Sequence, residues 1–83
     1  MMSDELKVLS TLKEIVAEVV PTAVISSDED CDRALSDIGI DSLDTMSILL
    51  EAQGKFGVEI PDEEIDKLTS LRAIAEYVAN KQG

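Results

Sequence analysis

The chain has 83 residues, which is enough for one small domain spanning residues 1–83. It contains no histidine and a single cysteine, so the commonest general base is missing and thiolate-rich metal sites and an intrachain disulfide are excluded. The formal net charge of −11 argues against nucleic acid and anionic membranes as partners and favours basic proteins.

The location is expected to be cytoplasmic. The sequence has no basic start followed by an apolar stretch, and no apolar run approaches the roughly 20 residues that span a membrane. The lone cysteine agrees with a reducing compartment. We therefore expect a soluble cytoplasmic monomer that uses no membrane contact.

The first predicted element is an amphipathic helix from about Ser3 to Val20, ended by Pro21. Its apolar positions recur at spacings of three and four, at Leu6, Leu9, Leu12, Val16 and Val19. Leu, Ile, Val and Ala supply most of the apolar content, and Phe56 and Tyr77 are the only aromatic residues. This composition favours a helical bundle over a sandwich of sheets.

Residues 21–41 sustain no helical period, yet a structureless stretch of about 20 residues is improbable in a small domain. We expect a short turn near residues 30–35 and a tight turn at Gly39, which has no Cβ to resist it. Four apolar side chains are expected to fasten the segment to the core: Val24, Ile25, Leu35 and Ile38.

Within this loop, Asp28, Asp30 and Asp32 alternate like the opening of a calcium-binding loop. Such a loop needs glycine at its sixth position and glutamate at its twelfth, where this chain has Arg33 and Gly39. We therefore interpret the segment as a solvated acidic loop and expect no metal site.

A second helix is predicted from about Ser42 to Lys55, with Asp41 as its N-cap and Asp44 as a short capping-box partner. Gly54 and Gly57 are expected to mark its end. Its apolar residues spread over more than one face, at Leu43, Met46, Ile48, Leu49 and Leu50. That width suggests that part of the apolar surface faces a partner or ligand.

The remaining elements are short. Residues 58–61 are expected to be extended, because the residue before Pro61 avoids the helical region. One or two helical turns are expected over 62–68, and Thr69 or Ser70 caps a last helix with apolar residues at Leu71, Ile74, Ala75 and Val78. The predicted fold class is all-α: a small four-helix bundle with a short third helix and a long first loop.

Among the hydroxyl groups of the chain, that of Ser42 is the strongest candidate for a chemical role. A hydrolase nucleophile needs an oriented base and usually lies in G-x-S-x-G, whereas this chain reads Gly39-Ile40-Asp41-Ser42 and has no histidine. We therefore expect no catalytic residue. The simplest alternative is that Asp41 and Ser42 only begin a helix.

The surrounding charge argues for more than a helix start. Between residues 28 and 44 the sequence has one basic residue, Arg33, and seven acidic residues: Asp28, Glu29, Asp30, Asp32, Asp37, Asp41 and Asp44. A second acidic cluster without a base follows at Glu59, Asp62, Glu63, Glu64 and Asp66. So many carboxylates around one hydroxyl indicate a docking surface.

Two segments resemble the acyl carrier protein family. They are residues 39–45, Gly-Ile-Asp-Ser-Leu-Asp-Thr, and residues 56–64, Phe-Gly-Val-Glu-Ile-Pro-Asp-Glu-Glu. The resemblance covers about residues 6–78. It implies that a phosphopantetheinyl transferase esterifies Ser42 with 4′-phosphopantetheine from coenzyme A. The thiol of this arm then holds acyl groups as thioesters for enzymes of fatty-acid, polyketide or related biosynthesis.

The resemblance also implies roles for other residues. Partner synthases would meet the carrier through basic patches, at the positions that correspond to Asp41, Leu43, Asp44, Met46, Glu51 and Asp62. The acyl chain would lie between the helices against Phe56, Ile60, Leu68 and Ile74, each of which is as readily an ordinary core residue. The rival interpretation is a carrier-like helical module that is never modified and acts as an interaction scaffold.

The chain departs from primary fatty-acid carriers at several positions. Those carriers usually have further acids along the second helix, where this chain has Ser47, Gln53, Gly54 and Lys55. Ile40 stands where they usually have alanine, and Ile38 where leucine is usual. These departures favour a dedicated pathway for a polyketide, a hybrid peptide or a specialised lipid.

Overall fold

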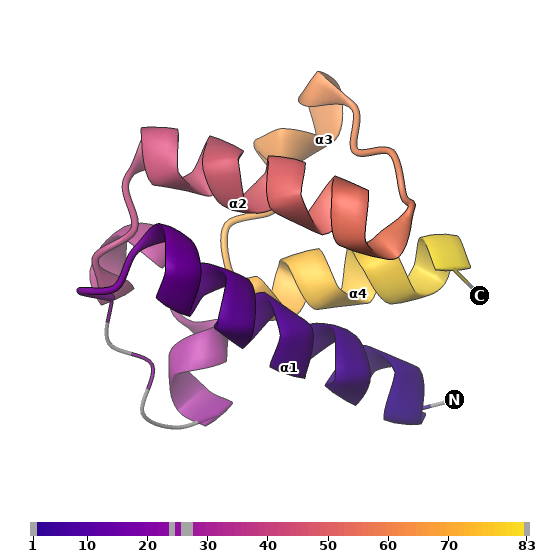
Figure 1. Ribbon diagram of the computed structural model, residues 1–83, viewed down its shortest axis with the longest axis horizontal. Helices are drawn as coiled ribbons and strands as arrows, with labels where there is room; N and C mark the ends of the chain where they lie inside the picture. The colour runs from indigo at the N-terminus through magenta and orange to yellow at the C-terminus, as the bar shows by residue number, and fades with distance from the viewer. Residues whose placement is uncertain (1, 24, 26–27, 83) are drawn as a thin grey trace.

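Four α-helices and two short 3-10 helices make up the regular structure in the computed structural model (Figure 1). The structure describes residues 2–23, 25 and 28–82, and no strand occurs among them. In chain order the elements are α1 (Met2–Val19), η1 (Asp28–Asp32), η2 (Leu35–Ile38), α2 (Ser42–Phe56), α3 (Asp62–Ile65) and α4 (Leu71–Gln82). The predicted all-α bundle with a short third helix is confirmed. α1 and α2 lie within one residue of their expected bounds, and α4 begins directly after its predicted cap.

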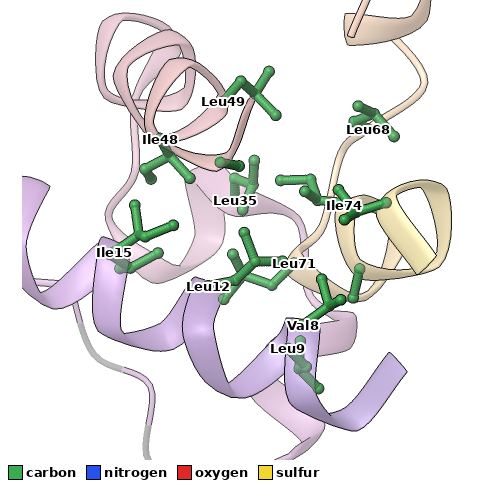
Figure 2. Close-up of a cluster of buried hydrophobic side chains, with 14 of the residues drawn as sticks. Val8, Leu9, Leu12, Ile15, Leu35, Ile48, Leu49, Leu68, Leu71 and Ile74 are labelled. Carbon is green, nitrogen blue, oxygen red and sulfur yellow. The ribbon is translucent and has the colours of Figure 1, made fainter. Parts of the chain in front are cut away.

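The core lies between the three long helices, where α1 packs against both α2 and α4. Figure 2 shows side chains from these helices and from the segments between them converging on one cluster. Its centre is fully buried, with exposed fractions of 0–1% at Leu12, Ile15, Ile48, Leu49, Leu71 and Ile74. Burial of this kind contributes about 1.5–3 kcal/mol for each large aliphatic side chain, and it is the main stabilising term of the bundle.

The predicted apolar face of α1 was wrong at Leu6, because the side chain of this residue is 60% exposed. With 3.6 residues per turn, Leu6 points about 120° away from Leu12 around the helix axis. The buried face instead includes Val8 and Ile15, which were absent from the predicted stripe. A spacing of three from Leu6 to Leu9 was therefore too weak a signal to place Leu6 on the core side.

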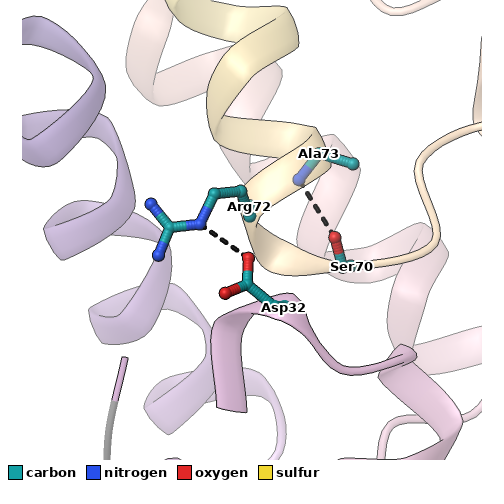
Figure 3. Close-up of polar contacts among 4 residues, drawn as sticks. All are labelled: Asp32, Ser70, Arg72 and Ala73. Carbon is teal, nitrogen blue, oxygen red and sulfur yellow. Dashed lines mark hydrogen bonds and ion pairs between the residues drawn. The ribbon is translucent and has the colours of Figure 1, made fainter. Parts of the chain in front are cut away.

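The long first loop is fastened to α4. The side chain of Cys31 in η1 is completely buried, and η1 contacts α4. Figure 3 shows Arg72 of α4 donating from Nε to Asp32 Oδ1 at 2.8 Å. This hydrogen bond, with the attraction between the two charges, raises the pKa of the Arg72 guanidinium above its ordinary value. Because the Asp32 side chain is 61% exposed, the pair contributes only about 0–1 kcal/mol, and burial of the loop's apolar side chains matters more.

The prediction that apolar side chains fasten this loop to the core is confirmed for those that the structure describes. Leu35 and Ile38 are buried, and Ile25 is half-buried against the core, whereas Val24 lies outside the described residues. The expected turn takes the form of two 3-10 helices. Their backbone is tied to a distant segment, because the Leu35 N–H donates to the Thr69 carbonyl at 2.9 Å.

Two side chains in the second half of the chain hold the junctions between helices and loops. Ser70 is the cap of α4, since its Oγ accepts from the Ala73 N–H at 3.1 Å (Figure 3), which decides between the two expected candidates. Gln53 of α2 accepts through Oε1 from the Ile60 N–H at 3.1 Å and holds the extended segment before α3.

Among the helices that the structure describes, none is long and apolar enough to cross a membrane.

Candidate functional site

The site is built on the turn between η2 and α2. Gly39 ends η2 with φ 88° and ψ 19°, a left-handed conformation that side chains with a Cβ rarely adopt, and its N–H donates to the Leu35 and Ser36 carbonyls. The Ile40 N–H also donates to the Leu35 carbonyl, at 3.0 Å, and the Ile40 side chain is only 2% exposed. The chain is therefore anchored in the core two residues before Ser42.

Asp41 is the N-cap of α2, as the sequence predicts. Its backbone is extended, with φ −86° and ψ −177°, and its carboxylate accepts from the Asp44 N–H at 2.9 Å. The Asp41 carbonyl accepts from both the Thr45 N–H at 2.9 Å and the Thr45 hydroxyl at 2.8 Å. These bonds fix the direction in which the first turn of α2 leaves the loop.

Ser42 is the first residue of α2, and it is exposed. The backbone N–H groups of a first helical turn give this end of the helix a partial positive charge, which favours an anionic substituent. The Asp41 and Asp44 side chains bring negative charge to the same turn. A serine hydroxyl in this setting is open to another enzyme and suited to carry a phosphate.

A cavity of about 500 Å³ opens beside Ser42. Its walls come from η2, the first turns of α2 and the segment around the end of α3, and they mix apolar groups, hydroxyls and two carboxylates. The lining residues are Ala34, Leu35, Ser36, Ile40, Asp41, Ser42, Thr45, Met46, Ile65, Asp66 and Thr69. Sequence reasoning missed this cavity, because residues 65–69, which are distant in the chain from the other lining residues 34–46, form part of its wall.

The residues expected to dock partners lie on two elements. Asp41, Leu43, Asp44, Met46 and Glu51 follow one another at and along α2, and Asp62 begins α3. Leu43 is 80% exposed and Met46 40%, so the predicted apolar surface on α2 exists. Leu50, 63% exposed, belongs to the same surface and was not among the expected docking residues. The broad apolar pattern of residues 43–50 was the signal that could have identified it.

The four residues expected to line an acyl pocket do not line the cavity beside Ser42. Ile60, Leu68 and Ile74 are buried in the core at 0–5% exposure, and Phe56 is half-buried against it. Their role toward an acyl chain stays a prediction. Apolar residues that do line the cavity beside Ser42 include Ile40, Met46 and Ile65.

The chain was compared with models of known protein families. The model described as "Phosphopantetheine attachment site" matches residues 10–78, which is most of the chain and includes all of α2 and α3. The exposed hydroxyl on a capped helix start fits a group that is linked through a phosphate. The chain therefore belongs to the family of carrier proteins to which 4′-phosphopantetheine is covalently attached.

Proposed function

We propose that Ser42 is the residue to which the phosphopantetheine arm is attached, and that the chain is a non-catalytic carrier of acyl groups. The observation that carries this proposal is the exposed Ser42 hydroxyl on a turn anchored by Ile40 and capped by Asp41. The bound arm supplies a terminal thiol that forms thioesters. The chain itself supplies the fixed point from which the arm extends.

Local charge supports a mobile arm. A phosphodiester at Ser42 is favoured by the N-terminal end of α2, while the nearby carboxylates of Asp41 and Asp44 repel it. The two effects oppose each other, so the phosphate is held only through its ester bond. An arm that is not bound down can present its thioester to successive enzymes.

Partner enzymes are proposed to approach along α2. The acidic side chains Asp41, Asp44 and Glu51 attract basic patches on a phosphopantetheinyl transferase and on acyl-processing synthases, with Asp62 on α3 as a further acidic contact. Within α2 no carboxylate follows Glu51, and the helix continues with Gln53, Gly54 and Lys55. This favours a dedicated pathway over the general fatty-acid synthase enzymes.

The test is the intact mass after incubation with coenzyme A and a broad-specificity phosphopantetheinyl transferase. The wild-type chain is expected to gain the mass of one phosphopantetheine group, and Ser42→Ala is expected to gain none. Ser47→Ala is the matched control, because Ser47 is an exposed serine of the same helix and should be modified like the wild type.

Two outcomes would contradict the proposal. If the wild type gains no mass, the chain is an unmodified module and the scaffold interpretation stands. If Ser42→Ala still gains the mass, another residue carries the arm. Far-ultraviolet circular dichroism of each variant ensures that a lost modification does not reflect a lost fold.

A further inference from the structure

The cavity beside Ser42 has an exposed mouth and a buried inner end. Leu35 and Ile40 line it although only 5% and 2% of these residues are exposed, so they contribute to its innermost surface. Ile65 also lines it, and this residue is half-buried and packs against the core. Apart from the half-buried Thr45, the other lining residues are exposed, and they form the mouth.

Leu35 and Ile40 separate this cavity from the hydrophobic core. Both belong to the cluster of buried side chains, and Figure 2 shows Leu35 among the core residues Ile48 and Leu71. Core side chains are packed closely, so further carbon atoms enter only where a side chain is displaced or shortened. We call the side chains of Leu35 and Ile40 the partition.

Backbone hydrogen bonds hold the walls of the cavity together. The Leu35 N–H donates to the Thr69 carbonyl at 2.9 Å, and this bond joins the wall from residues 34–36 to the wall from residues 65–69. The Leu35 carbonyl accepts from the Ile40 N–H at 3.0 Å, which fixes the backbone on both sides of the partition. The cavity therefore has the pre-formed character of a ligand pocket.

The size of the cavity limits what it holds. Ser42 belongs to its lining, so an arm attached there starts at the mouth. A volume of about 500 Å³ is ordinary for a small-molecule pocket, and here it has to hold the end of the folded arm as well as an acyl group. Carbon atoms beyond this volume would pass the polar side chains of Ser36, Asp66 and Thr69 and lie in water.

We propose that the partition, chiefly Ile40, makes this chain a carrier of short acyl groups, of about six carbon atoms or fewer, which fold back into the cavity beside Ser42. The proposal rests on the attachment at Ser42. A seated acyl group leaves water for contact with Ile40, Met46 and Ile65, and each buried methylene stabilises the loaded form. A longer chain gains no further contact, because the partition closes the way to the core.

The test compares acyl groups of different length on the same chain. A broad-specificity phosphopantetheinyl transferase loads the wild type from acetyl-, hexanoyl- or dodecanoyl-coenzyme A, and the intact mass confirms each loaded form. The measurement is the melting temperature of each form. Ile40→Ala and Ile38→Ala are the matched variants, because both shorten a buried isoleucine and only Ile40 lines the cavity.

In the wild type, hexanoyl is expected to raise the melting temperature by about 3 °C or more above the acetyl form, and dodecanoyl by less than about 1 °C beyond that. In Ile40→Ala the dodecanoyl form should melt about 3 °C or more above the hexanoyl form, because the shortened side chain opens the partition. Ile38→Ala should keep the plateau of the wild type. Each variant is compared with its own acetyl form, so its lower stability does not enter the comparison.

A second set of variants serves if an alanine variant does not fold. Ile40→Val and Ile38→Val each remove one methylene, and they should differ in the same direction by a smaller amount. Amide chemical shifts of the wild type give a measurement that does not depend on stability. Hexanoyl should move the signals of residues 34–36 and 65–69, and the change to dodecanoyl should leave those of Leu71 and Ile74 in place.

Three results would overturn the proposal. A wild-type melting temperature that keeps rising from hexanoyl to dodecanoyl would show that long chains enter the core. A melting temperature that no acyl group changes would show that the cavity seats no acyl group, and equal behaviour of Ile40→Ala and Ile38→Ala would remove Ile40 from the partition. In each case the intact mass still shows the loaded arm, so the failure is distinct from that of the attachment at Ser42, in which no arm is gained.

Discussion

At the scale of residues, the turn before α2 assigns different tasks to neighbouring side chains. Ile40 is buried and anchors the chain, Asp41 uses its carboxylate to cap the helix, and Ser42 is exposed to solvent. Thr45 closes the first turn by donating to the Asp41 carbonyl. The turn thus holds the backbone at Ser42 in a defined place and leaves this residue exposed.

The charge of the residue 44 side chain can be changed without loss of the N-cap bond of α2. It contributes its backbone N–H to the bond with Asp41, and this N–H remains in Asp44→Lys. A lysine in the first turn opposes the helix dipole and costs about 0.3–1 kcal/mol, so helicity should be nearly unchanged. We expect modification of Ser42 and transfer to partners to slow at low salt, measured as kcat/KM.

The effect of Asp44→Lys should shrink at about 0.5 M salt, because screening weakens steering by surface charges. The conservative control is Asp44→Asn, which removes the charge without reversing it and should slow transfer less. Equal rates for the wild type and Asp44→Lys at low salt would remove Asp44 from the docking surface.

At the scale of elements, α2 carries Ser42, part of the cavity wall and exposed apolar side chains, so its stability bears directly on the proposed function. The two glycines expected at its end differ in the structure. Gly57 is the true C-cap, with φ 65° and its N–H donating to the Gln53 carbonyl at 2.9 Å. Gly54 lies inside the helix, and a Cβ added there would have no atom outside its own stretch of helix within 4 Å.

These two glycines make a matched pair of alanine substitutions. Gly54→Ala is expected to stabilise the protein by about 0.5–1 kcal/mol, because alanine favours the helix and meets open space. Gly57→Ala is expected to destabilise it by about 1–2 kcal/mol, because alanine resists the left-handed conformation. Urea unfolding of both variants measures the difference, and a lower stability for Gly54→Ala would contradict the open, helical setting of Gly54.

At the scale of the whole molecule, an uncharged core is enclosed by a strongly acidic surface. Among the residues whose side chains the structure describes, no polar or charged one is buried, whereas the chain carries a formal net charge of −11. Repulsion between the surface carboxylates therefore opposes the compact state. The same field would attract the proposed basic partners, so we expect stability and recognition to depend on one feature.

Screening this repulsion should stabilise the fold. We expect the melting temperature to rise as sodium chloride increases to about 0.15 M, where the Debye length is about 8 Å, and to rise further with magnesium chloride at equal ionic strength. An uncharged solute at equal osmolality is the control. A melting temperature that responds to neither salt would show that self-repulsion is not a significant term.

Local rules were enough for much of the site. The Asp41 cap, the turn at Gly39 and the start of α2 follow from residue types within a few positions of one another. Ser42, which follows Asp41, could also be singled out from the local sequence alone. The apolar periodicity of α4 was also sufficient, because all four of its predicted core residues are fully buried.

Other features depend on segments that are distant in sequence. The cavity forms only where η2, α2 and the end of α3 meet, and the first loop is held by a bond from Leu35 to Thr69. The sides of α1 and α2 that remain exposed are set by how whole elements pack. For this reason Leu6 was wrongly assigned to the core face, and Leu50 was not among the expected docking residues.

The helices, the cap of α2 and the chemical character of the turn at Ser42 could be predicted from the amino-acid sequence, because they arise from interactions over about four residues. The burial of individual apolar side chains, the position of the cavity and the exposed face of α2 became known from the packed structure. Those properties depend on the packing of whole elements against one another, and periodicity within one helix does not specify its neighbours.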